Sequence, residues 1–298
     1  MLASCMQTVK ATYSLRPTAD ADSPPLTISS TQFTTTVATV CCVLAFPVYW
    51  VLVTALSDQA ALRSLPPSFW PAHPFWGIFA KVSTERPLLF WLWNSTLAAL
   101  GATALSMTGA VFAGYSLSRF AVRGSHSVGL FLLTAKMLPA ALLVIPLFAV
   151  FRSLNLIGSM WSIILAHATL IVPFATWMLK GYFDTVPREL EQAAMVDGCS
   201  PIGALFRVIL PLSAPGLAAT ALYGFILSWS DYVYARTFLT NAQSNWTVIL
   251  GITTMKGEYI SGWNEIAAAS IIAAGPVVLI YIFLERYLVG GLTAGAGK

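Results

Sequence analysis

Two charged residues lie inside long apolar stretches of the sequence, and their chemistry is the first clue to function. One is Lys136, and the other is Asp231, which stands between the aromatic residues Trp229 and Tyr232. A charge inside a membrane-spanning segment is costly and usually faces a cavity or a partner. Lys136 can donate hydrogen bonds to a hydroxyl or phosphate group of a bound solute, or it can pair with a carboxylate of a partner subunit, which is the interpretation we favour.

The other polar and aromatic residues of these stretches also have two interpretations. Trp229 and Tyr232 can stack on the apolar face of a cyclic solute, and they can equally belong to the aromatic belt at a membrane surface. In such segments, His167 and Asn94 more often hydrogen-bond between packed helices than bind a ligand. We therefore expect His167 and Asn94 to join helices.

The sequence contains none of the patterns expected of a catalytic, metal-binding or nucleotide-binding site. Its three histidines are far apart, and its four cysteines form no Cys-x-x-Cys pair. It has no Gly-rich loop that ends in Gly-Lys-Ser or Gly-Lys-Thr, so we expect this chain neither to hydrolyse ATP nor to hold a cofactor or metal. The net charge of +4 is spread along the chain and gives no basic tract for nucleic acid.

The composition predicts an all-α membrane protein. The chain is 57% hydrophobic and 9% charged, whereas a soluble domain carries about 25% charged residues. A helix needs roughly 20 mostly apolar residues to cross the hydrocarbon of a bilayer. Six such spans are expected, at about 34–56, 92–117, 127–151, 159–183, 212–235 and 264–284. Prolines at 139, 146 and 173 predict bent helices in the third and fourth spans.

The longest polar interruption lies between the fourth and fifth spans, at residues 186–211. Pro187 suits the first turn of a helix, and Gly198 suits the residue that ends it. Ser200 and Pro201 are a typical N-cap and first residue of a second short helix. The segment therefore predicts a helix-turn-helix that stands outside the bilayer.

This segment resembles the cytoplasmic loop of permease subunits of binding-protein-dependent ABC importers. The family pattern of Glu-Ala-Ala, Gly and Leu-Pro is present with its spacing intact, except that Gln192 replaces the glutamate and Glu191 stands beside it. In the family this loop contacts a separate ATPase, and we call residues 184–211 the coupling loop. The resemblance assigns ATPase coupling to Glu191, Gln192, Ala193, Ala194, Asp197, Gly198, Leu210 and Pro211.

The end of the chain resembles the C-terminus of sugar-type permeases. Residues 288–298 carry this resemblance, and a Gly-Tyr, Arg-Phe string at residues 114–120 also resembles these permeases. The resemblance implies import of an oligosaccharide, glycoside or polyol. It implies a heterodimer with a second permease subunit, two ATPase subunits that bind ATP and Mg²⁺, and an extracytoplasmic substrate-binding protein. It places the substrate path near the fifth span, where we assign Lys136, Trp229, Asp231 and Tyr232.

The expected organisation has three parts. Residues 1–33 form a polar, flexible cytoplasmic tail, residues 34–288 form the permease domain, and residues 289–298 form a cytoplasmic C-terminal tail. With six spans, both termini and the coupling loop lie on one side, which carries more Lys and Arg than the other. That asymmetry indicates the cytoplasmic side of a bacterial inner membrane.

Three alternatives remain open at this point. An ABC permease for a glycerophosphodiester, polyamine or amino acid would have similar spans. An ion-coupled secondary transporter usually shows internal repeats, and we find no convincing repeat between the two halves. A structural scaffold would leave Lys136 and Asp231 without a role. The sequence also leaves open whether Gln192 alters the ATPase contact or Glu191 compensates for it.

Overall fold

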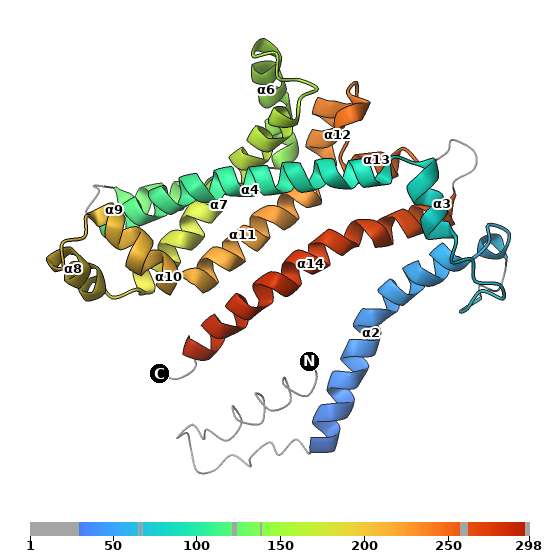
Figure 1. Cartoon of the computed structure of the whole chain (residues 1–298), viewed down its shortest axis with the longest axis horizontal. Coiled ribbons are helices and arrows are strands. Elements are labelled where there is room, and N and C mark those ends of the chain that lie inside the picture. Colours follow the sequence, from blue (N-terminus) through green and yellow to red (C-terminus); the bar gives the residue numbers. More distant parts are fainter. Residues whose placement is uncertain are drawn as a thin grey trace. The chain divides into compact units, whose positions relative to one another are not determined.

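The computed structural model describes residues 30–64, 66, 68–120, 124–137, 139–256 and 262–295. Side chains at 30, 31, 125, 126, 133, 135 and 288–295 are outside this description, as are the expected N-terminal tail up to residue 29 and the last three residues. The described part is all-helical (Figure 1). It divides into two compact units, residues 1–48 and 49–298.

The longer helices begin and end as follows: α2 Ser30–Leu56, α3 Ile78–Glu85, α4 Leu88–Arg119, α5 Ser125–Ala135, α6 Ala140–Ser153, α7 Met160–Thr185, α8 Arg188–Val196, α11 Ala214–Trp229, α12 Val233–Leu239 and α14 Trp263–Gly295. The short elements are η1 Ala61–Arg63, α9 Pro201–Ala204, η2 Leu205–Ile209, α10 Leu210–Leu212, η3 Gln243–Asn245 and α13 Val248–Thr253. The helix α14 includes residues 289–295, where we expected a tail to begin.

Four described helices are long and apolar enough to cross a membrane, namely Gln32–Leu56, Leu88–Arg119, Met160–Thr185 and Trp263–Tyr287. They coincide with the first, second, fourth and sixth expected spans. A bent pair, Pro201–Leu212 and Ala214–Trp229, passes the same test together, with an angle of 82° between its helices. The chain is thus a multi-pass membrane protein with four to five such helices in its described part.

The third expected span, 127–151, is not one helix. Helix α5 ends at Ala135, and α6 starts at Ala140, directly after Pro139. Proline has no N–H to donate and disfavours the helical conformation of the residue before it. Pro139 therefore explains why the helix is interrupted between α5 and α6. The 14 residues of α6 are too few to cross the hydrocarbon alone.

The fifth expected span, 212–235, also contains a break. Helix α11 ends at Trp229, and the Asp231 carboxylate then accepts hydrogen bonds from the backbone N–H groups of Tyr234 at 3.3 Å and Ala235 at 3.0 Å. These bonds satisfy donors at the start of α12 that have no partner within the helix. Asp231 is therefore a helix-capping residue as well as a residue with charge in an apolar region.

The core of the larger unit forms where α4 packs along α7 and α11 (Figure 1). Gly114 of α4 allows a close approach to α7, because a Cβ on Gly114 would lie 3.2 Å from the Thr176 oxygen of α7. Small residues at helix contacts are typical of membrane proteins. Side chains that fill this core include Ala102, Ala110, Ile171, Ala175, Leu179 and Phe183.

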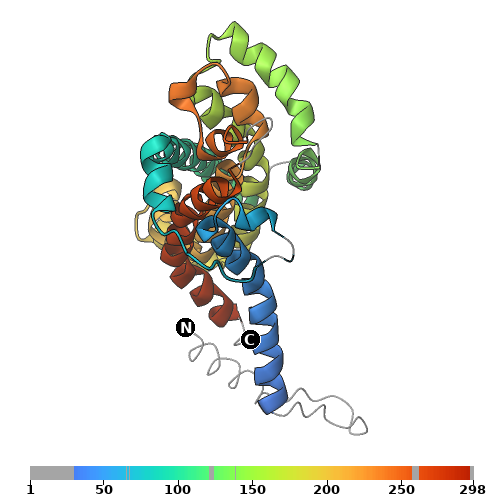
Figure 2. The ribbon, with the colours of Figure 1, turned by 90° about the vertical axis from the view of Figure 1, so that its right-hand side faces the viewer.

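Helices α6 and α12 lie side by side beyond one face of α4, and Figures 1 and 2 agree on this placement. Phe151 of α6 packs edge-on against Phe238 of α12, with ring centroids 5.4 Å apart. Asn94 of α4 donates hydrogen bonds to the backbone oxygens of Ser244 at 2.9 Å and Trp246 at 3.1 Å. Asn94 thus attaches the segment that follows α12 to helix α4.

Helix α3 is joined to the beginning of α14 by an ion pair. Lys81 Nζ lies 2.8 Å from Glu265 Oε1. The hydrogen bond to Glu265 and the charge of that residue, with a smaller contribution from Glu85, raise the pKa of Lys81. Trp91 packs over Gly251 nearby, where a Cβ would lie 2.2 Å from the indole ring.

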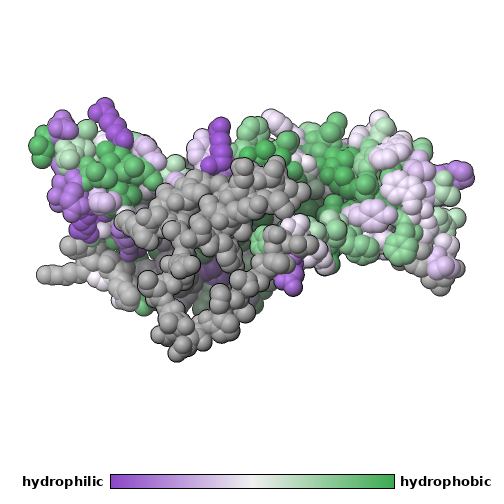
Figure 3. Space-filling view, turned by 90° about the horizontal axis from the view of Figure 1, so that it is seen from below, coloured by the Kyte–Doolittle hydropathy of each residue, from purple (hydrophilic) through white to green (hydrophobic). Residues whose placement is uncertain are grey.

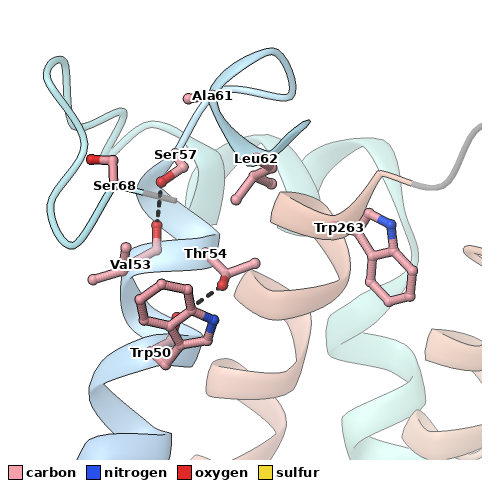
Figure 4. A pocket seen from close by; sticks show the side chains of 8 residues that line it. All are labelled: Trp50, Val53, Thr54, Ser57, Ala61, Leu62, Ser68 and Trp263. Atoms are coloured by element: carbon pink, nitrogen blue, oxygen red, sulfur yellow. Dashed lines mark hydrogen bonds between the residues drawn. The ribbon is translucent and has the colours of Figure 1, made fainter. Parts of the chain in front are cut away.

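A pocket of about 220 Å³ opens between the end of α2, η1 and the start of α14 (Figure 4). Its hydroxyl groups are used within the chain, since Thr54 donates to the Trp50 oxygen at 2.8 Å and Ser57 to the Val53 oxygen at 2.7 Å. The pocket therefore offers a solute few free polar groups.

Candidate coupling loop and membrane cavity

The first helix of the coupling loop is set by local chemistry. Helix α8 starts at Arg188, one residue after Pro187, so the proline precedes the helix rather than occupying its first position. At the other end Gly198 has φ +92°, a conformation that glycine adopts without steric cost. Its N–H donates to the Met195 oxygen at 3.1 Å, and the Cys199 N–H donates to the Ala194 oxygen at 3.0 Å. Gly198 therefore ends the helix, as predicted.

The second helix begins with the predicted cap and then changes its winding. Ser200 Oγ accepts a hydrogen bond from the Gly203 N–H at 3.1 Å, and Pro201 is the first helical residue. The segment Leu205–Ile209 is a π-helix in which the Leu210 N–H donates to the Leu205 oxygen. Pro211 follows, and its ring would crowd the carbonyl four residues earlier in a regular α-helix. The wider turn avoids that clash.

A buried ion pair joins the coupling loop to α4. Glu191 Oε2 lies 2.8 Å from Arg119 Nε, and both side chains are more than nine-tenths buried. The Tyr115 hydroxyl donates to Glu191 Oε1 and lies 3.2 Å from the carbonyl oxygen of Pro201. We call Tyr115, Arg119 and Glu191 the α4–loop cluster. It contacts both helices of the loop from one turn of α4.

Further bonds tie the first part of the loop to the same end of α4. Arg119 donates to the Val186 oxygen at 2.9 Å, and Arg188 donates to the Ser118 oxygen at 3.0 Å. Ser118 in turn donates to Asp184 Oδ1 at 2.6 Å. Charge-assisted bonds of this kind are stronger than bonds between neutral groups. The loop is thus attached to α4 at several points.

The predicted coupling residues divide between two faces. Glu191 and Ala194 are buried, while Gln192, Ala193, Asp197, Gly198 and Pro211 are exposed and Leu210 is half-buried. Glu191 is thus engaged within the chain, and Gln192 faces outward. Sequence reasoning missed Arg119 and Tyr115 as partners of Glu191. Their spacing of four residues, which places them on one face of a helix, was the available signal.

The exposed surface of the coupling loop carries both charged and large apolar side chains. Its exposed large apolar side chains are Leu190, Met195, Val196, Ile202 and Phe206. Val196 is 87% exposed. Large apolar side chains that are exposed can mark surfaces that contact other proteins. In Figure 3 strongly hydrophilic residues stand beside apolar ones at the end of the molecule that holds α8.

A second candidate site is a cavity of about 620 Å³ between the α5–α6 connection, α7 and α11–α12. Lys136 and Asp231 both line it, together with Ala140, Ala141, Leu143, Thr169, Leu170, Pro173, Leu227, Ser230, Val233 and Tyr234. The tertiary structure therefore brings two of the four predicted path residues to one cavity.

Trp229 and Tyr232 do not line this cavity. Trp229 is buried and stacks on Phe225, with ring centroids 5.4 Å apart. Tyr232 is 40% exposed at the break between α11 and α12. Their places in the structure favour packing and surface roles over stacking on a solute in the cavity.

His167 connects the helices around the cavity. Its Nε2 lies 3.2 Å from Asp231 Oδ2, and its Nδ1 lies 2.7 Å from Ser228 Oγ. The histidine side chain is 1% exposed. Its place between α7 and α11 is the helix-joining position expected from the sequence. It also holds the Asp231 carboxylate in position.

The fold and these two sites define a multi-pass helical membrane protein with a helical loop attached to α4 and a cavity among its helices, and comparison with known proteins gives its family. Residues 106–293 match the family "Binding-protein-dependent transport system inner membrane component", and the chain belongs to that family. The prediction of an ABC importer permease subunit is confirmed. Such subunits are transport components rather than enzymes.

Two relatives and one solved structure show how far the similarity extends. The sulfoquinovosyl glycerol transport system permease protein SmoH of Agrobacterium fabrum is 35% identical, over 85% of this chain and 88% of that protein. The diacetylchitobiose uptake system permease protein DasC of Streptomyces coelicolor is 34% identical, over 86% and 92%. A chain of a bacterial ABC transporter that imports the acidic polysaccharide alginate has the same fold, with a TM-score of 0.73. The two chains are 20% identical, and the match covers 89% of this chain and 99% of that one.

Proposed function

We propose that this chain is one of the two membrane-spanning subunits of an ABC importer that moves a saccharide into the cytoplasm. The names of its relatives support a saccharide as the cargo, since they include transporters of sulfoquinovosyl glycerol, diacetylchitobiose and trehalose or maltose. These named cargoes include both charged and neutral compounds, so family membership leaves the charge of the cargo open.

The proposed assembly has four kinds of protein component. This chain pairs with a second permease subunit, two ATPase subunits bind ATP and Mg²⁺, and an extracytoplasmic binding protein delivers the saccharide. Six spans cross a bacterial inner membrane, with α5 and α6 as a broken third span. The coupling loop and both termini then lie in the cytoplasm, on the side richer in Lys and Arg.

The α4–loop cluster is the observation that carries the proposed mechanism. Because Glu191 is buried against Arg119 and Tyr115, a displacement of the loop also displaces the end of α4. Helix α4 packs along α7 and α11, which border the cavity. Closure of the ATPase pair would move the loop and helices as one body and change which side of the membrane the cavity opens to.

The exposed face of the loop provides the surface that the ATPase would contact. Ala193 is small enough for a partner to approach the helix backbone, and Gln192 would offer a neutral hydrogen bond there. Leu190, Val196 and Phe206 would add apolar contact.

The experiment is saccharide uptake and ATP hydrolysis by the complete transporter reconstituted in liposomes with its binding protein. The probes are neutral and acidic oligosaccharides, polyols, glycerophosphodiesters and polyamines. Stimulation of ATP hydrolysis and uptake by a saccharide supports the proposal. Stimulation by the other solutes alone would refute the saccharide assignment. Transport driven by an ion gradient without ATP would refute the ABC mechanism.

A further inference from the structure

Lys136 is a positive charge at the cavity without a negative partner in the described part of the chain. No described carboxylate lies within 4.0 Å of its Nζ. The residue directly follows α5 and lies between two apolar segments, α5 and α6. A charge at such a place is costly unless a partner or water compensates it. The Lys136 charge therefore has no carboxylate beside it in the described part of the chain.

Asp231 lines the same cavity but does not supply the compensation. Its Oδ1 accepts from the Tyr234 N–H, and its Oδ2 accepts from the Ala235 N–H and lies 3.2 Å from His167 Nε2. These contacts hold the carboxylate at the start of α12. Both carboxylate oxygens of Asp231 are therefore occupied by contacts within the chain, whereas the Lys136 ammonium group can bind a solute.

The Lys136 side chain is held so that its amino group faces aromatic rings. It donates a hydrogen bond to the Tyr223 hydroxyl, and its Nζ lies 4.9 Å from the centroid of the Tyr223 ring and 5.9 Å from that of Phe174. Aromatic faces stabilise a cation without neutralising it. An ammonium group has three donors, so one bond to Tyr223 leaves two for another acceptor.

The rest of the cavity wall strengthens an ionic contact and suits a saccharide. Most of the lining is apolar, as at Leu143, Leu170 and Leu227, and charges attract more strongly where water is displaced. Thr169 and Ser230 add hydroxyl groups to the same wall. The Thr169 hydroxyl already donates to the Ala166 oxygen at 2.7 Å, so it can only accept a hydrogen bond from a sugar hydroxyl. The Ser230 hydroxyl can donate or accept.

We propose that Lys136 binds the anionic group of an acidic saccharide, and that this residue makes the cavity selective for saccharides that carry a carboxylate or a sulfonate. This inference rests on the proposed saccharide-import function and names its substrate class. The carboxylate and the sulfonate share one chemistry at Lys136, a negatively charged group that accepts hydrogen bonds from an ammonium ion. The two are distinguished by the probes.

The test uses the complete reconstituted transporter and matched pairs of probes. Galacturonic acid trimer is compared with galactose trimer, and 6-deoxy-6-sulfoglucose is compared with glucose. The variants are Lys136→Met, Lys136→Arg and, as a control for loss of an exposed positive charge, Arg236→Gln. Co-purification of all subunits is measured for each variant.

We expect the wild-type transporter to take up an acidic probe. Lys136→Met should lower that uptake by at least about tenfold, because this is the effect typical of losing one hydrogen bond to a charged group. Uptake of any neutral saccharide should change less than twofold. Lys136→Arg keeps the charge and should retain acidic uptake, and Arg236→Gln should behave as wild type. The acidic probe whose uptake falls in Lys136→Met shows whether Lys136 binds a carboxylate or a sulfonate.

Three results would overturn the inference and leave the proposed function in place. The first is that the wild-type transporter takes up neutral saccharides alone. Lys136→Met could leave acidic uptake unchanged. It could also prevent co-purification of the second permease subunit, which would assign Lys136 to a carboxylate of that subunit. Absence of stimulation by every saccharide would instead refute the proposed function.

Discussion

Replacement of Glu191 by Gln tests whether the α4–loop cluster attaches the coupling loop to α4. The substitution keeps the shape of the side chain and removes its charge, which leaves the buried Arg119 guanidinium without its counter-ion. Removal of one partner of a buried ion pair costs about 3–5 kcal/mol. At about 1.4 kcal/mol per tenfold, the lower value corresponds to a shift of about 100-fold away from the attached state of the loop.

Two assays on the complete transporter measure this effect. Thermal unfolding in detergent should show a lower midpoint for Glu191→Gln. ATP hydrolysis should lose its stimulation by the loaded binding protein, because a detached loop no longer transmits displacement to α4. The matched control is Glu189→Gln, which removes an exposed carboxylate from the same helix.

A double substitution separates the charge from the packing. Arg119→Met combined with Glu191→Leu replaces the buried pair by apolar side chains of similar size, a change that is often neutral or stabilising. We expect the double variant to regain much of the stability that Glu191→Gln loses. The reasoning is refuted if Glu191→Gln matches the control in both unfolding and stimulated hydrolysis.

Three further substitutions test single features of the structure. Gly198→Val should strain the backbone at φ +92° by about 1–2 kcal/mol and uncouple hydrolysis from uptake, and wild-type coupling would contradict the role of the turn. Ala193→Asp adds charge to the exposed face of α8, and it should prevent co-purification of the ATPase without lowering the unfolding midpoint. Gly251→Ala should destabilise the fold by about 1–3 kcal/mol because its Cβ would clash with Trp91. Gly109→Ala is its control, since apart from its chain neighbours and the backbone of its own helix no atom lies within 4 Å of the added Cβ.

The coupling loop shows how much of a site can be predicted from local sequence. A proline before a helix, a glycine after it and a serine–proline pair are signals that act within a few residues. Gly198 and Ser200 therefore take the conformations that the sequence predicts. Which side of α8 faces the protein is a different question, because its answer depends on α4, and the sequence placed Glu191 and Gln192 together in one coupling surface.

The broken spans show a limit of hydropathy. The stretches 127–151 and 212–235 are apolar enough to predict continuous helices, yet α5 ends before Pro139 and α11 ends before Asp231. Hydropathy averages over about 20 residues and does not register the missing proline N–H or a carboxylate that caps a new helix. From the sequence, Pro139 predicts a bend and Asp231 a charge within a span, and neither predicts the end of a helix.

The sequence by itself determined that this protein is a helical membrane permease subunit and that residues 186–211 contain two short helices, because apolar content, caps and a spaced motif are properties of neighbouring residues. The tertiary structure alone decided which distant residues meet. It brought Arg119 and Tyr115 to Glu191, His167 to Asp231, and Lys136 to the cavity that Asp231 also lines. These contacts depend on how α4, α7 and α11 pack, and helix packing is decided by the whole set of facing side chains rather than by any one segment.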